Sequence, residues 1–139
     1  YSVNQVGTEA AAVTACNIIT QLHPDTIISA GTAGGFAERG ALIGDVVVSR
    51  GGFFFHDHHI PVDQRYEEYG RGSYPCLEVP QLIAYLRLKS GVISTGNSMR
   101  ISLRELRCID QYRAIAKEME VAAIAKIAIE KFLFIMYLF

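Results

Sequence analysis

Pro24-Asp25-Thr26-Ile27-Ile28-Ser29-Ala30-Gly31-Thr32-Ala33-Gly34-Gly35 is the stretch that decides the fold class. Its first part, Thr26–Ala30, is a short β-branched run that opens directly into the glycine loop of residues 31–35. Before it lies Thr8–Leu22, which is rich in alanine, spaced like a helix, and stops ahead of Pro24. A helix, a buried strand and a glycine loop in this order indicate an α/β protein.

Further strands are predicted after this unit, at residues 45–49, 52–56, 91–95 and 132–139. The first two are apolar runs without alternation, as expected of strands buried on both faces. The last is also uniformly apolar and is far shorter than the roughly 20 residues of a membrane helix, so we expect a buried strand. Residues 66–80 carry two glycines and two prolines and are predicted to form a long loop.

Helices are predicted at residues 81–89, after Ser102, and from Glu120 onward. Ser102 and Glu105 have the spacing of a capping box, in which each side chain satisfies a backbone N–H of the other residue. The helix after Glu120 is indicated by an apolar stripe, formed by Val121, Ile124, Ala125, Ala128 and Ile129. Strands that alternate with helices predict a mostly parallel or mixed sheet, covered on both faces, in one domain over residues 1–139.

The composition narrows the class of protein. Half of the 139 residues are apolar, and 13 basic against 14 acidic residues leave a formal charge of -1 with no Lys/Arg run, which disfavours nucleic-acid binding. The three cysteines are odd in number and widely spaced, so they indicate neither a disulfide framework nor a zinc site. The first residues lack the pattern of a secretory signal. We therefore expect a cytoplasmic protein without a membrane partner.

Three places where a strand ends are candidates for binding, because ligands of such sheets lie beyond the carboxyl ends of the strands. The first is the glycine loop with the Thr32 hydroxyl, which is equally consistent with a tight turn. The second is the turn after Thr95, where Met99 would pack on a heterocycle, although an ordinary turn also fits. The third is Glu120, which could be no more than a charge at a helix start.

Three histidines and a carboxylate occur together at His56, Asp57, His58 and His59. Imidazole is a common metal ligand, but on a strand only His56 and His58 share a face, and no second cluster completes a tetrahedral site. We therefore predict a polar strand end with a hydrogen-bonded histidine, and neither a metal nor a cofactor.

The set of motifs, taken in order, resembles the purine nucleoside phosphorylase and uridine phosphorylase superfamily, and within it the plant-type methylthioadenosine nucleosidases. The resemblance covers nearly the whole chain, and its segments are residues 6–11, 24–36, 44–48, 55–57, 94–98 and 118–120. It implies a three-layer α/β/α sandwich around a mixed, barrel-like sheet, usually paired into a homodimer.

The resemblance also implies roles for individual residues. Glu120 would bind the ribose hydroxyls, with Met119 against the sugar, while Met99 and the backbone after Gly96 would hold the purine. Thr32 would line the site of the attacking water together with the loop residues Ala33 and Gly34. Tyr66 and Tyr69 would reach toward the pocket of a partner subunit. Asn97 stands where the family often has aspartate.

The implied reaction is hydrolysis of the N-glycosidic bond of 5'-methylthioadenosine to adenine and methylthioribose, a step of methionine salvage. A carboxylate on the 2' hydroxyl, here Glu120, stabilises the oxocarbenium-like transition state. The family's acidic aspartate and water-activating glutamate have no counterpart here, so we expect a chain that is incomplete at both termini. A phosphate-dependent purine nucleoside phosphorylase and a non-catalytic nucleoside-binding fragment stay open, as does the use of S-adenosylhomocysteine.

Overall fold

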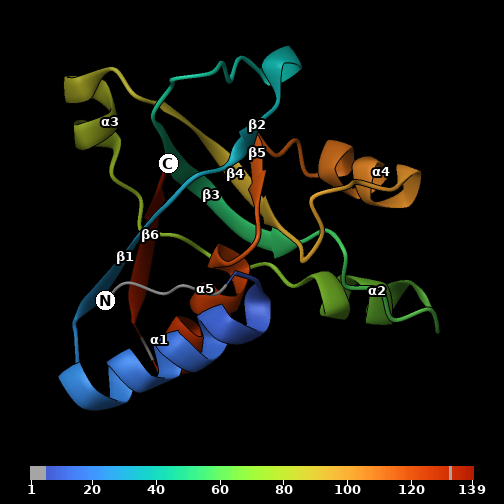
Figure 1. The fold of residues 1–139 in the computed structure, drawn as a ribbon, viewed down its shortest axis with the longest axis horizontal. Coiled ribbons are helices and arrows are strands. Elements are labelled where there is room, and N and C mark those ends of the chain that lie inside the picture. Colours follow the sequence, from blue (N-terminus) through green and yellow to red (C-terminus); the bar gives the residue numbers. More distant parts are fainter. Residues whose placement is uncertain (1–5, 132) are drawn as a thin grey trace.

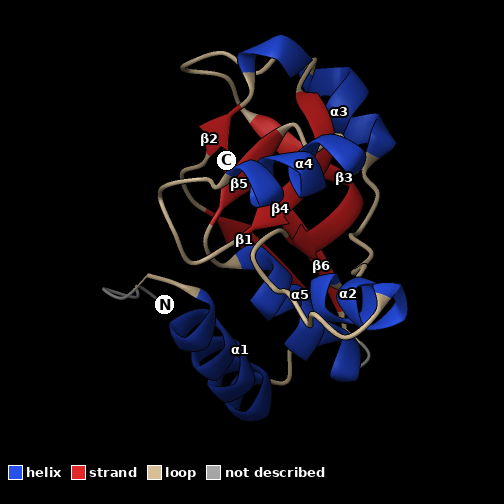
Figure 2. Ribbon diagram, turned by 90° about the vertical axis from the view of Figure 1, so that its right-hand side faces the viewer, coloured by secondary structure: helices blue, strands red, loops and turns tan. Residues whose placement is uncertain are grey.

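The computed structural model describes residues 6–131 and 133–139, and within them a six-stranded sheet carries helices on both faces (Figures 1 and 2). The helices are α1 (Thr8–Leu22), the 3-10 turn η1 (Ala37–Arg39), α2 (Gln64–Arg71), α3 (Pro80–Leu86), α4 (Leu103–Gln111) and α5 (Val121–Glu130). The strands are β1 (Thr26–Ala30), β2 (Gly34–Gly35), β3 (Val47–Phe55), β4 (Lys89–Thr95), β5 (Ala116–Glu118) and β6 (Phe134–Leu138).

The sheet has the strand order β1-β6-β3-β4-β5-β2. Strands β3, β4 and β5 are parallel neighbours, as are β1 and β6, whereas β2 with β5 and β3 with β6 are antiparallel. The predicted α/β class and mixed sheet are therefore confirmed, and among the described residues the sheet is open, with β1 and β2 at its edges. Parallel pairing brings the carboxyl ends of β3, β4 and β5 to one side.

The two faces of the sheet bury different helices. Phe53 and Phe55 on β3 pack into the larger core with α1 and α5, whereas Phe54 packs with Cys108 and Ile109 of α4. Successive side chains of a strand point to opposite faces, so one run of three phenylalanines anchors both layers. Strand β3 thus carries apolar residues toward both layers, and its predicted burial on both faces is confirmed.

Several predicted elements occur at their predicted positions, but two predictions of burial are wrong. Helix α1, strand β1 and the Ser102–Glu105 capping box at the start of α4 are found as predicted. Strand β1 was expected to be buried, however, and its residues alternate between exposed and half-buried. Helix α5 begins after Glu120, but Ile129 of its predicted buried stripe is exposed. Because α5 lies between the sheet and α1, residues outside the predicted stripe are buried as well. These are Ala122 and Ala123.

The two strands predicted at residues 45–49 and 52–56 form the single strand β3. The prediction missed the continuity because Gly51 and Gly52 resemble a turn, whereas they form an irregularity inside the strand, with φ of +81° and +103° and a register shift against β4. A side chain at Gly52 would place its Cβ 2.5 Å from the Tyr74 carbonyl oxygen. Glycine is thus required there by both backbone geometry and close approach.

The loop predicted at residues 66–80 is wrong in its first part, since Tyr66 lies inside helix α2. Asp63 starts this helix by accepting hydrogen bonds from the backbone amides of Arg65 and Tyr66, at 2.8 and 3.3 Å. Gly70 lies inside the helix, and Gly72 is the C-cap residue at its end, so the two glycines do not prevent the helix. The helix predicted at residues 81–89 is shorter, because Lys89 already begins β4.

The strand predicted at residues 132–139 is β6, although its first residue, Phe132, lies outside the described residues, as do residues 1–5 at the start of the chain. None of the helices in residues 6–131 and 133–139 has the length and hydrophobicity needed to cross a bilayer.

Candidate functional site

A cavity of about 490 Å³ opens between β1, α1 and α5. Its wall is mostly apolar, and its side-chain polar groups are Thr14, Ser29, Thr32, Glu120 and Tyr137. An apolar pocket with a few converging polar groups is typical of a small-molecule site. Two residues far apart in the sequence, Thr32 after β1 and Glu120 before α5, therefore line one cavity, as expected if they act together.

The Glu120 carboxylate is held by backbone amides at this cavity. Its Oε1 accepts a hydrogen bond from the Gly7 N–H at 2.9 Å, and its Oε2 accepts one from the Met119 N–H at 3.2 Å. Glu120 is the N-cap residue of α5, yet its side chain makes no capping hydrogen bond to that helix. Its alternative interpretation, as a charge that merely stabilises a helix start, is therefore not supported by its contacts.

Glu118, at the end of β5, takes the capping position that Glu120 leaves. Its side chain is 3% exposed, and its Oε2 accepts hydrogen bonds from the Glu120 and Val121 amides, both at 2.7 Å. Its Oε1 accepts from the Thr95 hydroxyl. Burial raises the pKa of Glu118 to about 7, and these hydrogen bonds only partly offset that effect.

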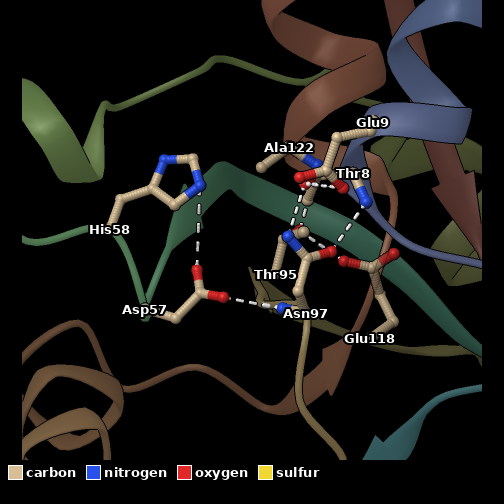
Figure 3. A network of polar contacts seen from close by, with 8 residues as sticks. All are labelled: Thr8, Glu9, Asp57, His58, Thr95, Asn97, Glu118 and Ala122. Atoms are coloured by element: carbon tan, nitrogen blue, oxygen red, sulfur yellow. Dashed lines mark hydrogen bonds and ion pairs between the residues drawn. The ribbon is translucent and has the colours of Figure 1, made fainter.

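Thr95 completes this arrangement from the end of β4. Its Oγ1 accepts a hydrogen bond from the Ala122 N–H at 3.0 Å while its hydroxyl donates to Glu118, and Figure 3 shows these three residues meeting beside the start of α5. Sequence reasoning missed both Thr95 and Glu118 as members of a site. The available signal was that each is a polar residue at the end of a predicted or short strand.

A second polar network joins the loop after β4 to α1 (Figure 3). Asn97 Oδ1 accepts from the Thr8 N–H at 2.8 Å, and Asn97 Nδ2 donates to the Thr8 hydroxyl at 2.7 Å. The Asn97 N–H donates to Asp57 Oδ2 at 2.7 Å, which ties the ends of β3 and β4 to the same point. This network fixes the start of α1, and with it the Gly7 amide that binds Glu120.

Four other predicted site residues are not among those that line the cavity. Met99 is 84% exposed, Met119 and Ala33 are half-buried, and Gly34 lies in β2, paired with Lys117. Lys117 also holds the loop that carries Met99, because its Nζ donates to the Met99 carbonyl at 3.2 Å. Contact of these four residues with a substrate stays a prediction.

Tyr66 and Tyr69 lie on α2, and both side chains are exposed. They stand on a helix and not in the irregular loop that the sequence predicted. Their contact with the pocket of a partner subunit stays a prediction.

The histidine cluster holds a buried imidazole. His56 is 1% exposed, burial lowers its pKa, and its Nδ1 has no hydrogen-bond partner among the described residues, so the predicted hydrogen bond of a histidine at this strand end is not seen at this nitrogen. His58 stacks on Phe55, with ring centroids 3.9 Å apart. Within residues 6–131 and 133–139, no group of three or more His, Cys, Asp or Glu side chains is gathered as metal ligands.

Tyr137 of β6 is a cavity residue that sequence reasoning missed. Its ring is buried, and burial together with the nearby Glu118 and Glu120 carboxylates raises its pKa well above the usual range. The phenol therefore stays protonated and is available as a hydrogen-bond donor. The signal in the sequence was a single hydroxyl within an otherwise apolar run.

Comparison with known proteins finds one family model that covers most of the chain, described as the phosphorylase superfamily and matching residues 2–131. A 5'-methylthioadenosine/S-adenosylhomocysteine nucleosidase of Arabidopsis thaliana is 44% identical over 127 residues, which are 91% of this chain and 49% of that protein. A 5'-methylthioadenosine nucleosidase of the same plant is 40% identical over 126 residues, 91% of this chain and 46% of that protein. The chain thus spans about half the length of the curated relatives it matches.

Solved structures show the same likeness. The 5'-methylthioadenosine nucleosidase of Arabidopsis thaliana in apo form superimposes with a TM-score of 0.91 at 37% identity, over 99% of this chain and 55% of that one. The S-adenosylhomocysteine nucleosidase of Streptococcus pyogenes, in complex with 5-methylthiotubericidin, superimposes with a TM-score of 0.74 at 28% identity, over 96% of this chain and 61% of that one.

Proposed function

The chain belongs to the phosphorylase superfamily, and from this premise we propose that its protein hydrolyses the N-glycosidic bond of 5'-methylthioadenosine to adenine and methylthioribose. The observation that carries the proposal is the meeting of Thr32 and Glu120 at one largely apolar cavity. The names of the Arabidopsis relatives support the choice of nucleoside. The 5-methylthiotubericidin bound in the streptococcal structure supports a pocket for a ligand that carries a methylthio group.

Glu120 is suited to the ribose. Its two carboxylate oxygens accept hydrogen bonds from backbone amides, which hold the carboxylate in one orientation. The same oxygens can accept further hydrogen bonds from ribose hydroxyls. As the base departs, positive charge develops on the ribosyl ring, and a fixed carboxylate beside the 2' hydroxyl stabilises it. Thr32 contributes a hydroxyl on the β1 side of the same cavity, where a water molecule would approach.

The test is product analysis with the protein expressed from its own gene. Incubated with 5'-methylthioadenosine, it is expected to release adenine and methylthioribose at the same rate with and without added phosphate. Formation of a sugar 1-phosphate only when phosphate is present would contradict hydrolysis and indicate a phosphorylase. Tight binding of the nucleoside with no release of adenine would contradict catalysis altogether. S-adenosylhomocysteine in the same assay tells whether the pocket accepts the larger 5' substituent.

We further propose a cytoplasmic homodimer that serves methionine salvage. Three free thiols, one of them the exposed Cys16, support a reducing compartment. The exposed Tyr66 and Tyr69 on α2 support an interface, since tyrosines are enriched where subunits meet. Light scattering of the purified protein is expected to give twice the monomer mass, and the Tyr69→Ser variant should shift it toward the monomer. An unmodified protein that is monomeric at micromolar concentration contradicts the dimer.

A further inference from the structure

We infer that Glu118 is a positioning residue for Glu120: it occupies the amino end of α5, so that the Glu120 carboxylate stays turned toward the cavity. The inference rests on the proposed role of Glu120 in binding ribose. It concerns a buried carboxylate that the reaction chemistry itself does not use.

The argument begins with the free amides of the helix. The first N–H groups of an α-helix have no partner within the helix, and the N-cap side chain normally supplies an oxygen for one of them. In α5 the N-cap residue is Glu120, and it does not do so. The Glu120 and Val121 amides donate instead to Glu118 Oε2, and the next amide, that of Ala122, donates to Thr95 Oγ1.

Removal of the Glu118 carboxylate would leave the part-buried Glu120 amide and the buried Val121 amide without their acceptor, next to the Glu120 carboxylate. A helix amino terminus favours negative charge, and an unpaired buried amide is costly, so the Glu120 side chain would be drawn back onto its own helix. It would then give up its hydrogen bonds to Gly7 and Met119, which now hold it at the cavity. Glu118 therefore acts on ribose binding through Glu120 without touching the sugar.

The surroundings of Glu118 make this support sensitive to protonation. The Glu120 charge beside α5 raises the pKa of Glu118, and Glu118 in turn raises the pKa of Tyr137 on β6. The charged form of Glu118 is stabilised by hydrogen bonds from Thr95 and the two helix amides. Protonation would convert one acceptor oxygen of Glu118 to a donor and weaken its hydrogen bonds with the amides at the amino end of α5.

The test compares two ligands, 5'-methylthioadenosine, which carries ribose, and adenine, which does not. Glu118→Ala in the protein expressed from its own gene is expected to weaken nucleoside binding about tenfold, measured by calorimetry, with adenine affinity within about twofold of the unmodified protein. Glu118→Gln should restore nucleoside affinity to within about threefold, because its amide oxygen can accept the same two N–H groups. Glu38→Ala, at an exposed position of η1, is the matched control.

The outcomes separate the inference from the proposed function. If Glu120→Ala loses nucleoside affinity but Glu118→Ala does not, or if Glu118→Ala loses nucleoside and adenine affinity equally, the positioning role is overturned while the function stands. If Glu120→Ala binds the nucleoside normally, the proposed role of Glu120 itself fails. If Glu118→Ala does not fold, Thr95→Val serves as the second variant, because it removes the hydroxyl that donates to Glu118. It is expected to weaken the affinity for the nucleoside but not for adenine. Thr95→Ser, which keeps the hydroxyl, should restore the nucleoside affinity. Equal affinity in both Thr95 variants overturns the inference.

Discussion

Asn97, on the loop after β4, caps the start of α1 through Thr8: its Oδ1 accepts the Thr8 amide at 2.8 Å, and its Nδ2 donates to the Thr8 hydroxyl at 2.7 Å. The residue in the N-cap position of α1 is Gly7, which has no side chain to do this. A distant part of the chain therefore completes the helix. The same helix start presents the Gly7 amide to Glu120. The Asn97 cap and the carboxylate proposed to bind ribose are therefore both hydrogen-bonded to the first residues of α1.

Asn97→Ala should lower the free energy of unfolding by about 1–2 kcal/mol, because it leaves the Thr8 amide without its cap. Urea denaturation followed by circular dichroism measures the change. Asn17→Ala, at an exposed position of the same helix, is the control and should be neutral or slightly stabilising, since alanine favours helix. Equal effects of the two substitutions would show that Asn97 does not cap the helix.

Gly96→Ala should destabilise the protein by about 1–3 kcal/mol, because an added methyl group overpacks the buried imidazole of His56. The Cβ of residue 96 would lie 2.3 Å from His56 Nε2. Gly34→Ala is the comparison, since its Cβ would meet nothing closer than 3.7 Å. Thermal denaturation of both variants checks the difference, and a Gly96→Ala protein as stable as Gly34→Ala would contradict the close packing.

The stability of the fold should depend on pH through Glu118. Its pKa is raised from 4.5 to about 7 in the folded protein, so folding favours the protonated carboxyl. The contribution is fully present below pH 4.5 and is lost as the pH rises through 7, which corresponds to a fall of about 3 kcal/mol in the free energy of unfolding. Urea unfolding at a series of pH values measures it. The Glu118→Gln protein should lack this decrease, and an identical pH profile in both proteins would contradict the assignment.

Catalysis should depend on Glu120, at the N-cap of α5, far more than on Glu130 at the other end of that helix. Glu120→Gln is expected to lower kcat/KM for 5'-methylthioadenosine by about 10²- to 10³-fold, because a neutral amide cannot stabilise the developing positive charge. Glu130→Gln, at the exposed far end of the same helix, is the control and should retain full activity. Initial rates of adenine release check both, and a loss of less than about threefold in Glu120→Gln would remove Glu120 from the mechanism.

The sequence was informative where a local pattern and the final environment agree. The α1–β1 unit and the start of α5 follow from spacing, proline and glycine alone, and Glu120 was singled out by its place before α5. Helix α2 was missed although its start signal, Asp63, was present, because glycines nearby were given more weight. The role of Glu118 could not be predicted, since its partner Thr95 lies on another strand and only the folded sheet brings the two together.

Strand β1 pairs in parallel with β6, with Thr26 opposite Phe134 and Ala30 opposite Leu138. During synthesis β1 leaves the ribosome long before the residues that it needs, and at about 5–20 residues per second it waits roughly 5 to 20 s for them. Throughout that interval its backbone groups are open to pairing with other nascent chains. Timely folding in the cell would then depend on a chaperone, or on α1 shielding β1 until the last strand arrives.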